Sequence, residues 1–342
     1  MNIINDTLNV VYFTSNMFAE PCAVSIASLF ENNKKYLSIQ VYIIEDNVSK
    51  ENIEKFNILA QNYGRKINFI SMPLPELFYN DNRFTIAALG HTFCRMALGK
   101  LLPKEIDKVL CMDSDMLVLQ SLDELWSTDI DNYYVAGVDS APGIAMMKKT
   151  LKIEPGTLYC NGGLFLVNLK KVRNDKKEED YENYIRCLFN ENKSLGAYEE
   201  EVINKCCYPQ ILRLHPKFNL MTVNMVMDYE SFIEYRGAVN YYSKMDMEEA
   251  LKFPVIIHAI NTFYIRKRIW EKDSDSPYAD KYIMYRQYTP WKDLPLIEIK
   301  RTFKQKIMKD IWHIFPPKIS FKVASFVRNQ IRPLLTKKRD DE

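Results

Sequence analysis

The first 72 residues alternate between short apolar, β-branched runs and segments whose apolar residues recur at helical spacing. The runs predict strands at residues 9–14, 38–45 and 66–72, and the intervening segments predict helices at residues 20–33 and 50–63. Parallel neighbours in a sheet need a long connection between them, which these helices supply. The alternation therefore predicts an α/β fold with a parallel sheet and right-handed crossovers.

The rest of the chain continues this pattern less regularly. Strands are predicted at residues 108–112, 134–139 and 163–168, a mixed helix at residues 84–98, and a charged loop or helix start at residues 176–180. No run of about 20 apolar residues occurs, so no membrane-spanning helix is expected. The N-terminus has no basic region followed by an apolar run, so no signal peptide is expected either. The seven cysteines lie mostly within apolar runs, as expected for reduced core thiols of a cytoplasmic protein.

The character of the chain changes after Trp270, where a polar break occurs at residues 273–277. We expect a catalytic domain at residues 1–275 and a basic, aromatic-rich C-terminal extension at residues 276–342. Within residues 319–331, Val323, Phe326 and Val327 recur at helical spacing and are flanked by Lys322 and Arg328. This pattern favours association with an anionic membrane surface.

Two alternatives to membrane association stay open for this segment. It could be a tail helix that packs on the catalytic domain, or a nucleic-acid-binding patch. The formal net charge of the whole chain is only +2, which argues against binding of nucleic acid or other polyanions.

Two carboxylates follow directly after the apolar strand at residues 108–112, in the order Asp113, Ser114, Asp115. Ligands of open α/β sheets bind at the carboxyl ends of strands. Residues i and i+2 of an extended chain point to the same side, so both carboxylates can reach one ion. Oxygen ligands suit Mg²⁺ or Mn²⁺, and such an ion could bridge the two phosphates of a nucleotide diphosphate. An ordinary acidic turn is the alternative.

A third candidate ligand, His258, ends another apolar run that starts at residue 253. Imidazole suits Mn²⁺ better than Mg²⁺, although a histidine after a strand is more often a hydrogen-bonded structural residue. The basic residues Arg266, Lys267 and Arg268 follow, and cations near a metal-bound diphosphate would offset the charge of a leaving group.

Taken in order, these motifs resemble glycosyltransferase family eight, the group of bacterial lipopolysaccharide galactosyl- and glucosyltransferases and the glycogenins. The resemblance covers residues 9–270 and is carried by residues 10–15, 92–95, 108–115, 122–126, 159–169, 199–204 and 256–258. It implies a GT-A fold, that is, a Rossmann-like mixed sheet with flanking helices. It also implies a divalent metal (Mn²⁺ or Mg²⁺), a UDP-sugar donor and retention of the anomeric configuration.

The resemblance also implies roles for individual residues. Asp113, Asp115 and His258 are the implied metal ligands. The residues implied at the reacting centre are Arg95, Asp139, Glu199 and Glu200. The residues implied to bind the donor are Thr14, Ser15, Asn16, Ser114, Asn161, Gly162, Lys267 and Arg268.

This chain departs from the family pattern at three places. Ser15 and Met17 stand where an Asp and an Asn usually read the uracil base, so the base contact is weakened or remade. The Gly and Lys that usually follow the metal histidine are altered, and Lys267, slightly favoured over Arg268, is expected to replace that lysine. Residues 199–201 are three glutamates where Asp-Gln-Asp is usual, which places a carboxylate rather than an amide at Glu200.

We therefore expect a metal-dependent, retaining hexosyltransferase. It would move glucose or galactose from a UDP-sugar to a cell-surface glycan, such as lipopolysaccharide or another lipid-linked saccharide, at the inner face of the plasma membrane. Two other functions stay open: a non-catalytic membrane-associated nucleotide-sugar-binding protein, and a nucleotide-sugar pyrophosphorylase. The latter normally has a Gly-rich basic loop after its first strand, and residues 14–18 contain neither Gly nor Lys.

Overall fold

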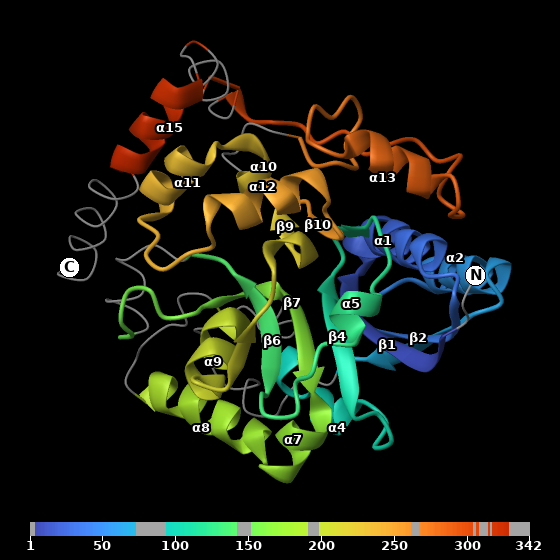
Figure 1. Ribbon diagram of the computed structural model, residues 1–342. Coiled ribbons are helices and arrows are strands. Elements are labelled where there is room, and N and C mark those ends of the chain that lie inside the picture. The colour runs from blue at the N-terminus through green and yellow to red at the C-terminus, as the bar shows by residue number, and fades with distance from the viewer. Residues whose placement is uncertain are drawn as a thin grey trace.

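A seven-stranded mixed sheet with helices on both faces forms the centre of the computed structural model (Figure 1). The structure describes residues 4–72, 94–141, 152–190, 198–260, 267–303, 306–307, 314 and 317–327. The strand order is β3-β2-β1-β4-β7-β6-β8. The GT-A arrangement implied by the resemblance is therefore present.

The N-terminal half of this sheet is parallel, as the alternation of runs predicts. β1 (Ile4–Ser15) pairs in parallel with β2 (Tyr36–Asp46) and β4 (Lys108–Asp113), and β2 pairs in parallel with β3 (Lys66–Ser71). The connecting helices are α1 (Ala19–Asn32) and α2 (Lys50–Asn62). All five elements predicted in the first 72 residues are confirmed.

The other half of the sheet is not purely parallel. β7 (Cys160–Asn168) runs antiparallel to both β4 and β6 (Val135–Asp139), and β8 (Ile211–Arg213) runs parallel to β6. A buried strand carries apolar residues on both faces whichever way it runs, so its residue pattern does not specify its direction. The sheet as a whole is therefore mixed, as the resemblance to the GT-A fold implies.

Alternate side chains of the strands fill two separate cores. Val10 and Tyr12 of β1 lie in the cluster that α1 and α2 cover. Val11 and Phe13 lie in the cluster on the opposite face, which includes residues of α7 (Leu169–Asn174), α8 (Lys177–Asn190) and α9 (Tyr198–Cys207). The charged segment at residues 176–180 is thus a helix start. Both faces of β1 are apolar because both are covered.

A second, three-stranded sheet lies beside the end of β4. β10 (Ile256–His258) pairs antiparallel with β5 (Met116–Val118) and parallel with β9 (Leu220–Met221). The backbone of Val118 is held to α1 by the side chains of Ser28 and Asn32, each at 2.9 Å. In this register His258 lies opposite Met116, directly after the second aspartate of the acidic pair.

The remaining elements are short helices around these two sheets. They are η1 (Asn16–Phe18), α4 (Leu98–Leu101), α5 (Asp123–Trp126), η4 (Pro216–Phe218), α10 (Thr222–Val226), α11 (Tyr229–Arg236) and α12 (Lys244–Lys252). Most of the helix predicted at residues 84–98 lies outside the described residues. All seven cysteines are free; five are buried, as expected of core thiols, whereas Cys206 is half-buried and Cys187 is exposed.

The segment after residue 275 packs on the core at several places, two of them through helices (Figure 1). Trp291 lies in the main core cluster with its ring centroid 5.5 Å from that of Phe56, and Arg301 pairs with Glu271 at 2.9 Å. α13 (Ala279–Arg286) packs on α1, where Arg286 Nε forms a buried ion pair with Glu20 Oε1 at 2.7 Å. α15 (Pro317–Phe326) lies beside α11 and buries Phe321 there. α15 covers the described part of the amphipathic helix predicted at residues 319–331. No helix among the described residues is long and apolar enough to cross a bilayer. The division of the chain at residue 275 stays a prediction.

Candidate active site

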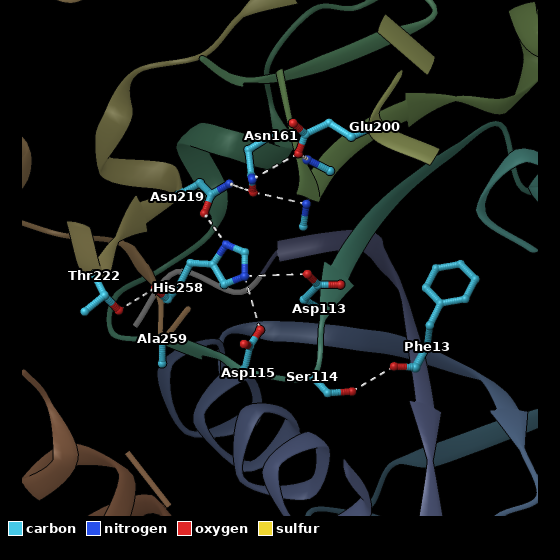
Figure 2. A network of polar contacts seen from close by, with 12 residues as sticks. Phe13, Asp113, Ser114, Asp115, Asn161, Glu200, Asn219, Thr222, His258 and Ala259 are labelled. Atoms are coloured by element: carbon cyan, nitrogen blue, oxygen red, sulfur yellow. Dashed lines mark hydrogen bonds and ion pairs between the residues drawn. The ribbon is translucent and has the colours of Figure 1, made fainter. Parts of the chain in front are cut away.

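Three residues predicted as metal ligands converge where the two sheets meet (Figure 2). Asp113 ends β4, Asp115 precedes β5, and His258 ends β10. His258 Nε2 lies 3.1 Å from Asp115 Oδ1 and 3.5 Å from Asp113 Oδ2. One ligand atom from each of the three lies within 4.8 Å of the others. The antiparallel pairing of β5 with β10 makes this convergence possible, because Ala259 N donates to the Asp115 carbonyl oxygen at 2.9 Å.

Cationic side chains surround these two carboxylates. Arg95 donates to Asp113 Oδ1, and Arg268 NH1 lies 3.1 Å from Asp115 Oδ2. Burial raises the pKa of Asp113, but Arg95 and His258 together lower it to about 2. Burial lowers the pKa of His258, and attraction to Asp115 and Asp113 outweighs this and raises it to about 9. Asp113 is therefore held in the form that binds a cation.

The donor set fits a divalent cation. Two carboxylates and one imidazole nitrogen are ligands that Mn²⁺ or Mg²⁺ accepts, the imidazole favouring Mn²⁺. The backbone of Gly163 passes so close to the cluster that an added Cβ would lie 2.4 Å from His258 Cε1 and 2.7 Å from Asp113 Oδ2. A glycine at this position leaves both ligands where they are.

A cavity of about 260 Å³ opens beside the cluster, between the end of β1 and Arg268. The residues that line it are Phe13, Thr14, Ser15, Phe18, Arg95, Asp113, Ser114, Asp115 and Arg268. The Arg268 guanidinium also donates to the Ala259 carbonyl at 2.9 Å and stacks on Trp270, 5.3 Å from the ring centroid. The cavity thus joins acidic metal ligands and cationic side chains, as a site for a metal-bound diphosphate requires.

Four residues predicted to bind the donor lie outside this lining: Asn16, Asn161, Gly162 and Lys267. Lys267 Nζ donates to the Lys272 carbonyl oxygen at 2.7 Å, whereas the neighbouring Arg268 lines the cavity. Asn16 Oδ1 accepts from Ser49 N at 2.9 Å, at the start of α2. In this structure Arg268 is the better placed of the two candidate phosphate-binding cations.

The predicted donor-sugar residues form a second group next to the cluster. Glu200 Oε2 accepts from Gly162 N at 2.6 Å and lies 3.3 Å from Asn161 Nδ2. Burial raises the pKa of Glu200 to about 7. Glu199 Oε1 lies 3.6 Å from Arg95 NH1, and Arg95 also donates to the Gly162 carbonyl oxygen. Arg95 thus contacts both the metal-ligand group and the sugar group.

Asp139 occupies a different environment at the end of β6. Its Oδ2 lies 2.9 Å from Arg213 NH2, and its Oδ1 accepts from Ala141 N at 2.9 Å. Burial raises its pKa to about 6, despite the Ala141 and Arg213 contacts. In this structure its carboxylate is directed at Arg213, so its contact with a donor sugar stays a prediction.

Two residues of the site carry no assignment from the sequence. Asn219 contacts His258 and Asn161 (Figure 2). The backbone of Gly163 passes against His258 and Asp113. The Gly162-Gly163 pair lies within residues 159–169, one of the segments that carry the family resemblance, so the sequence could have indicated Gly163. No local pattern marks Asn219, which precedes a strand of two residues.

Comparison with known proteins relates this site to sugar-transferring enzymes. The family described as glycosyl transferase family 8 matches residues 9–263. A putative glycosyltransferase of Haemophilus influenzae is 31% identical over 219 residues, which are 63% of this chain and 64% of that protein. Lipopolysaccharide 1,2-glucosyltransferase of Escherichia coli is 24% identical over 302 residues, covering 85% of this chain and 81% of that protein.

Solved structures show the same fold. The bifunctional glycosyltransferase WbbM superposes with a TM-score of 0.70 at 19% identity, covering 85% of this chain and 51% of that chain. The galactosyltransferase LgtC, solved with donor and acceptor sugar analogues, superposes with a TM-score of 0.63 at 16% identity, covering 88% of this chain and all of that chain. The chain thus spans about half of WbbM and just under two thirds of the H. influenzae relative.

Proposed function

We propose that this chain, which belongs to glycosyl transferase family 8, transfers a hexose from a UDP-sugar to a cell-surface glycan with retention of configuration. Glucose or galactose is the favoured sugar, and lipopolysaccharide or another lipid-linked saccharide is the favoured acceptor. The observation that carries the proposal is the convergence of Asp113, Asp115 and His258 beside a cavity that the two aspartates line together with Arg95 and Arg268. The names of the E. coli relative and of LgtC support the substrate class.

In this reaction the bond between the anomeric carbon and the diphosphate breaks, and its electron pair leaves with UDP. A bond to the acceptor oxygen forms, and the acceptor hydroxyl loses its proton. Asp113, Asp115 and His258 would hold Mn²⁺ or Mg²⁺, which would neutralise charge on the departing diphosphate. Arg268, stacked on Trp270, is placed to bind the same diphosphate.

Glu200 is the group proposed to act at the anomeric carbon. Retention follows from two displacements, with Glu200 as the first nucleophile, or from a front-face path in which a diphosphate oxygen takes the acceptor proton. In the second path the Glu200 carboxylate stabilises positive charge on the sugar. Its hydrogen bond from Gly162 N, at 2.6 Å, fixes it beside the predicted sugar-binding loop in either path.

Hydrolysis of donor sugars without an acceptor tests the proposal directly. We expect UDP to be released from UDP-glucose or UDP-galactose in the presence of Mn²⁺, and release to stop when the metal is chelated. GDP-sugars serve as the control for base preference, because Ser15 and Met17 replace the usual base-reading pair. A protein that binds Mn²⁺ and UDP but releases no UDP from any donor would be the non-catalytic alternative. Formation of UDP-sugar from UTP and a sugar phosphate would indicate the pyrophosphorylase.

The C-terminal helix is proposed to hold the enzyme on an anionic membrane at the inner face of the plasma membrane. One face of α15 is buried against α11 through Phe321, which is 7% exposed. The opposite face exposes Val323 and Phe326, at 53% and 60%, with Lys318 and Lys322 beside them. Apolar residues between lysines are the composition that binds the interface of an anionic bilayer.

We expect the double substitution Val323→Glu and Phe326→Glu to abolish sedimentation with phosphatidylglycerol vesicles, while UDP release stays unchanged. Both side chains are exposed, so the fold should tolerate the change. High salt should weaken binding of the wild type. Leu37→Glu, at a side chain 63% exposed on β2, is the matched control and should bind vesicles normally. Unchanged vesicle binding by the double variant would rule out this face of α15 as the membrane contact.

A further inference from the structure

An unbroken series of polar contacts joins the metal-ligand cluster to Glu200 (Figure 2). His258 Nδ1 lies 3.1 Å from Asn219 Oδ1, and Asn219 Nδ2 donates to Asn161 Oδ1 at 2.9 Å. Asn161 Nδ2 in turn lies 3.3 Å from Glu200 Oε2. Asn219 is only 1% exposed and His258 only 3%. Side chains from separate parts of the chain therefore form one relay, buried at Asn219 and His258 and half-buried at Asn161 and Glu200.

The chemistry of each group fixes the orientation of the next. An ionised carboxylate only accepts hydrogen bonds, so Asn161 presents its NH₂ group to Glu200 and its oxygen to the other side. That oxygen also accepts from Gly163 N at 3.1 Å, which holds it there. Asn219 must then direct its NH₂ group at this oxygen, and its own oxygen faces His258.

The orientation of Asn219 determines which nitrogen of His258 is available. An amide oxygen only accepts, so the contact at 3.1 Å requires a proton on His258 Nδ1. Nε2, directed at Asp113 and Asp115, is then the nitrogen that can bind a cation. Thr222 Oγ1 also donates to the His258 carbonyl oxygen at 3.2 Å, and this contact involves the backbone of His258 and not its ring.

We propose that Asn219 is a positioning residue: it fixes the ring and tautomer of His258 as a metal ligand and, through Asn161, couples the metal site to the carboxylate at the sugar site. The inference rests on the proposed function for the identity of these two sites. Partners that orient a ligating histidine are generally worth 10- to 100-fold in metal affinity or activity. Asn219 acts on the reaction through His258 and Asn161.

Two substitutions of Asn219 separate its contact with His258 from its contact with Asn161. Asn219→Leu removes both polar contacts at similar volume, and we expect it to weaken Mn²⁺ binding by about 10- to 100-fold. Asn219→Asp keeps an acceptor for His258 Nδ1 but has no donor for Asn161. We expect the Asp variant to bind Mn²⁺ as the wild type does, but to have a lower kcat with an unchanged donor KM. Mn²⁺ affinity is measured without donor, from the free ion seen by electron paramagnetic resonance.

Asn33→Leu is the matched control for loss of a buried amide. Asn33 is 0% exposed, and its Oδ1 accepts from Leu122 N at 2.8 Å, within the core beside α1. This variant should lower the melting temperature of the metal-free protein without weakening Mn²⁺ binding. Wild-type Mn²⁺ affinity in Asn219→Leu would overturn the inference.

The two proposals fail in different ways. A wild type that binds Mn²⁺ but turns over no UDP-sugar would refute the proposed function, and the Mn²⁺ affinities of the variants would still test the relay. Should Asn219→Leu not fold, Asn219→Asp decides. Retained Mn²⁺ affinity together with a lowered kcat in that variant supports the positioning role. A 10- to 100-fold loss of Mn²⁺ affinity overturns it, because the acceptor for Nδ1 is still present, and so does a wild-type kcat.

Discussion

Asp115→Asn should lower turnover of the UDP-sugar donor by about 10³-fold or more, because a metal-stabilised leaving group is worth several kcal/mol of barrier. Asp115 is one of the two proposed anionic ligands, and its Oδ1 lies 3.1 Å from His258 Nε2. An amide oxygen in its place is a weaker ligand for a hard cation. The side chain also accepts from Arg268 at 3.1 Å, so the substitution loosens the cation proposed to bind the diphosphate. The measurement is UDP release across an Mn²⁺ titration.

The control for this experiment is a substitution that removes one negative charge at another position. Asp175→Asn removes a carboxylate that pairs with Lys171 at 2.9 Å on the far side of the fold from the cavity, and we expect it to leave turnover unchanged. The melting temperature of metal-free Asp115→Asn should stay near that of the wild type, because both strands that flank the site keep their backbone pairing. Wild-type turnover at saturating Mn²⁺ would remove Asp115 from the metal site.

Glu200→Gln should lower kcat by about 10²- to 10³-fold with little change in donor KM. A carboxylate that acts as nucleophile or stabilises developing positive charge contributes mainly in the transition state, and a neutral amide of the same shape lacks its charge. Gln at this position still accepts from Gly162 N, so the geometry of the loop is kept. A raised KM at unchanged kcat would move Glu200 out of the reacting centre.

The same substitution should have the opposite effect on stability. The pKa of Glu200 is about 7 in the folded protein, above the ordinary 4.5, so the folded state favours the protonated form. The stability that this group contributes is therefore complete below about pH 4.5 and is lost as the pH rises through 7. At pH 8 we expect Glu200→Gln to be more stable than the wild type by about 2 kcal/mol, which is less than the full pKa shift would give because the side chain keeps some contact with solvent. The gain should shrink towards pH 5.

Activity should depend on pH through the same group. Because the ionised form is the active one in both proposed paths, kcat of the wild type should rise with pH through about 7 and then level off. Glu200→Gln should lack this rise. Glu201→Gln is the control, since that neighbour is 1% exposed and accepts from Tyr184 OH at 2.9 Å, away from the sugar loop. It should leave both kcat and the pH profile unchanged.

Much of the fold was predictable because burial and sequence pattern agree over the first 72 residues. β1 and β2 place apolar residues in the clusters on both faces of the sheet, and α1 and α2 cover one of these faces, so local periodicity determines the element type. Strand direction is not encoded in this way. The antiparallel β7 could be anticipated only from the family resemblance, because its residues are apolar whichever way it runs.

The convergence of Asp113, Asp115 and His258 was predictable for a related reason, whereas their surroundings were not. Asp113 and His258 each end an apolar strand, which marks them as residues at the functional edge of a sheet. Asn219 and Gly163 act through distances between segments far apart in the sequence, and no periodicity reports such distances. The choice between Lys267 and Arg268 likewise depended on the direction of two long side chains, which the structure shows to differ.

The pairing of β10 with β5 determines when, during synthesis of the chain, all three candidate ligands are present. Both aspartates are synthesised early, yet their histidine partner arrives only with a strand near the end of the catalytic region. Domains fold from the N-terminus as they emerge, so a nascent or prematurely terminated chain can carry a largely complete seven-stranded sheet and still lack the third ligand. The proposed metal site is thus completed only when the catalytic region is nearly complete. Fragments released before His258 is added should be unable to consume nucleotide sugar.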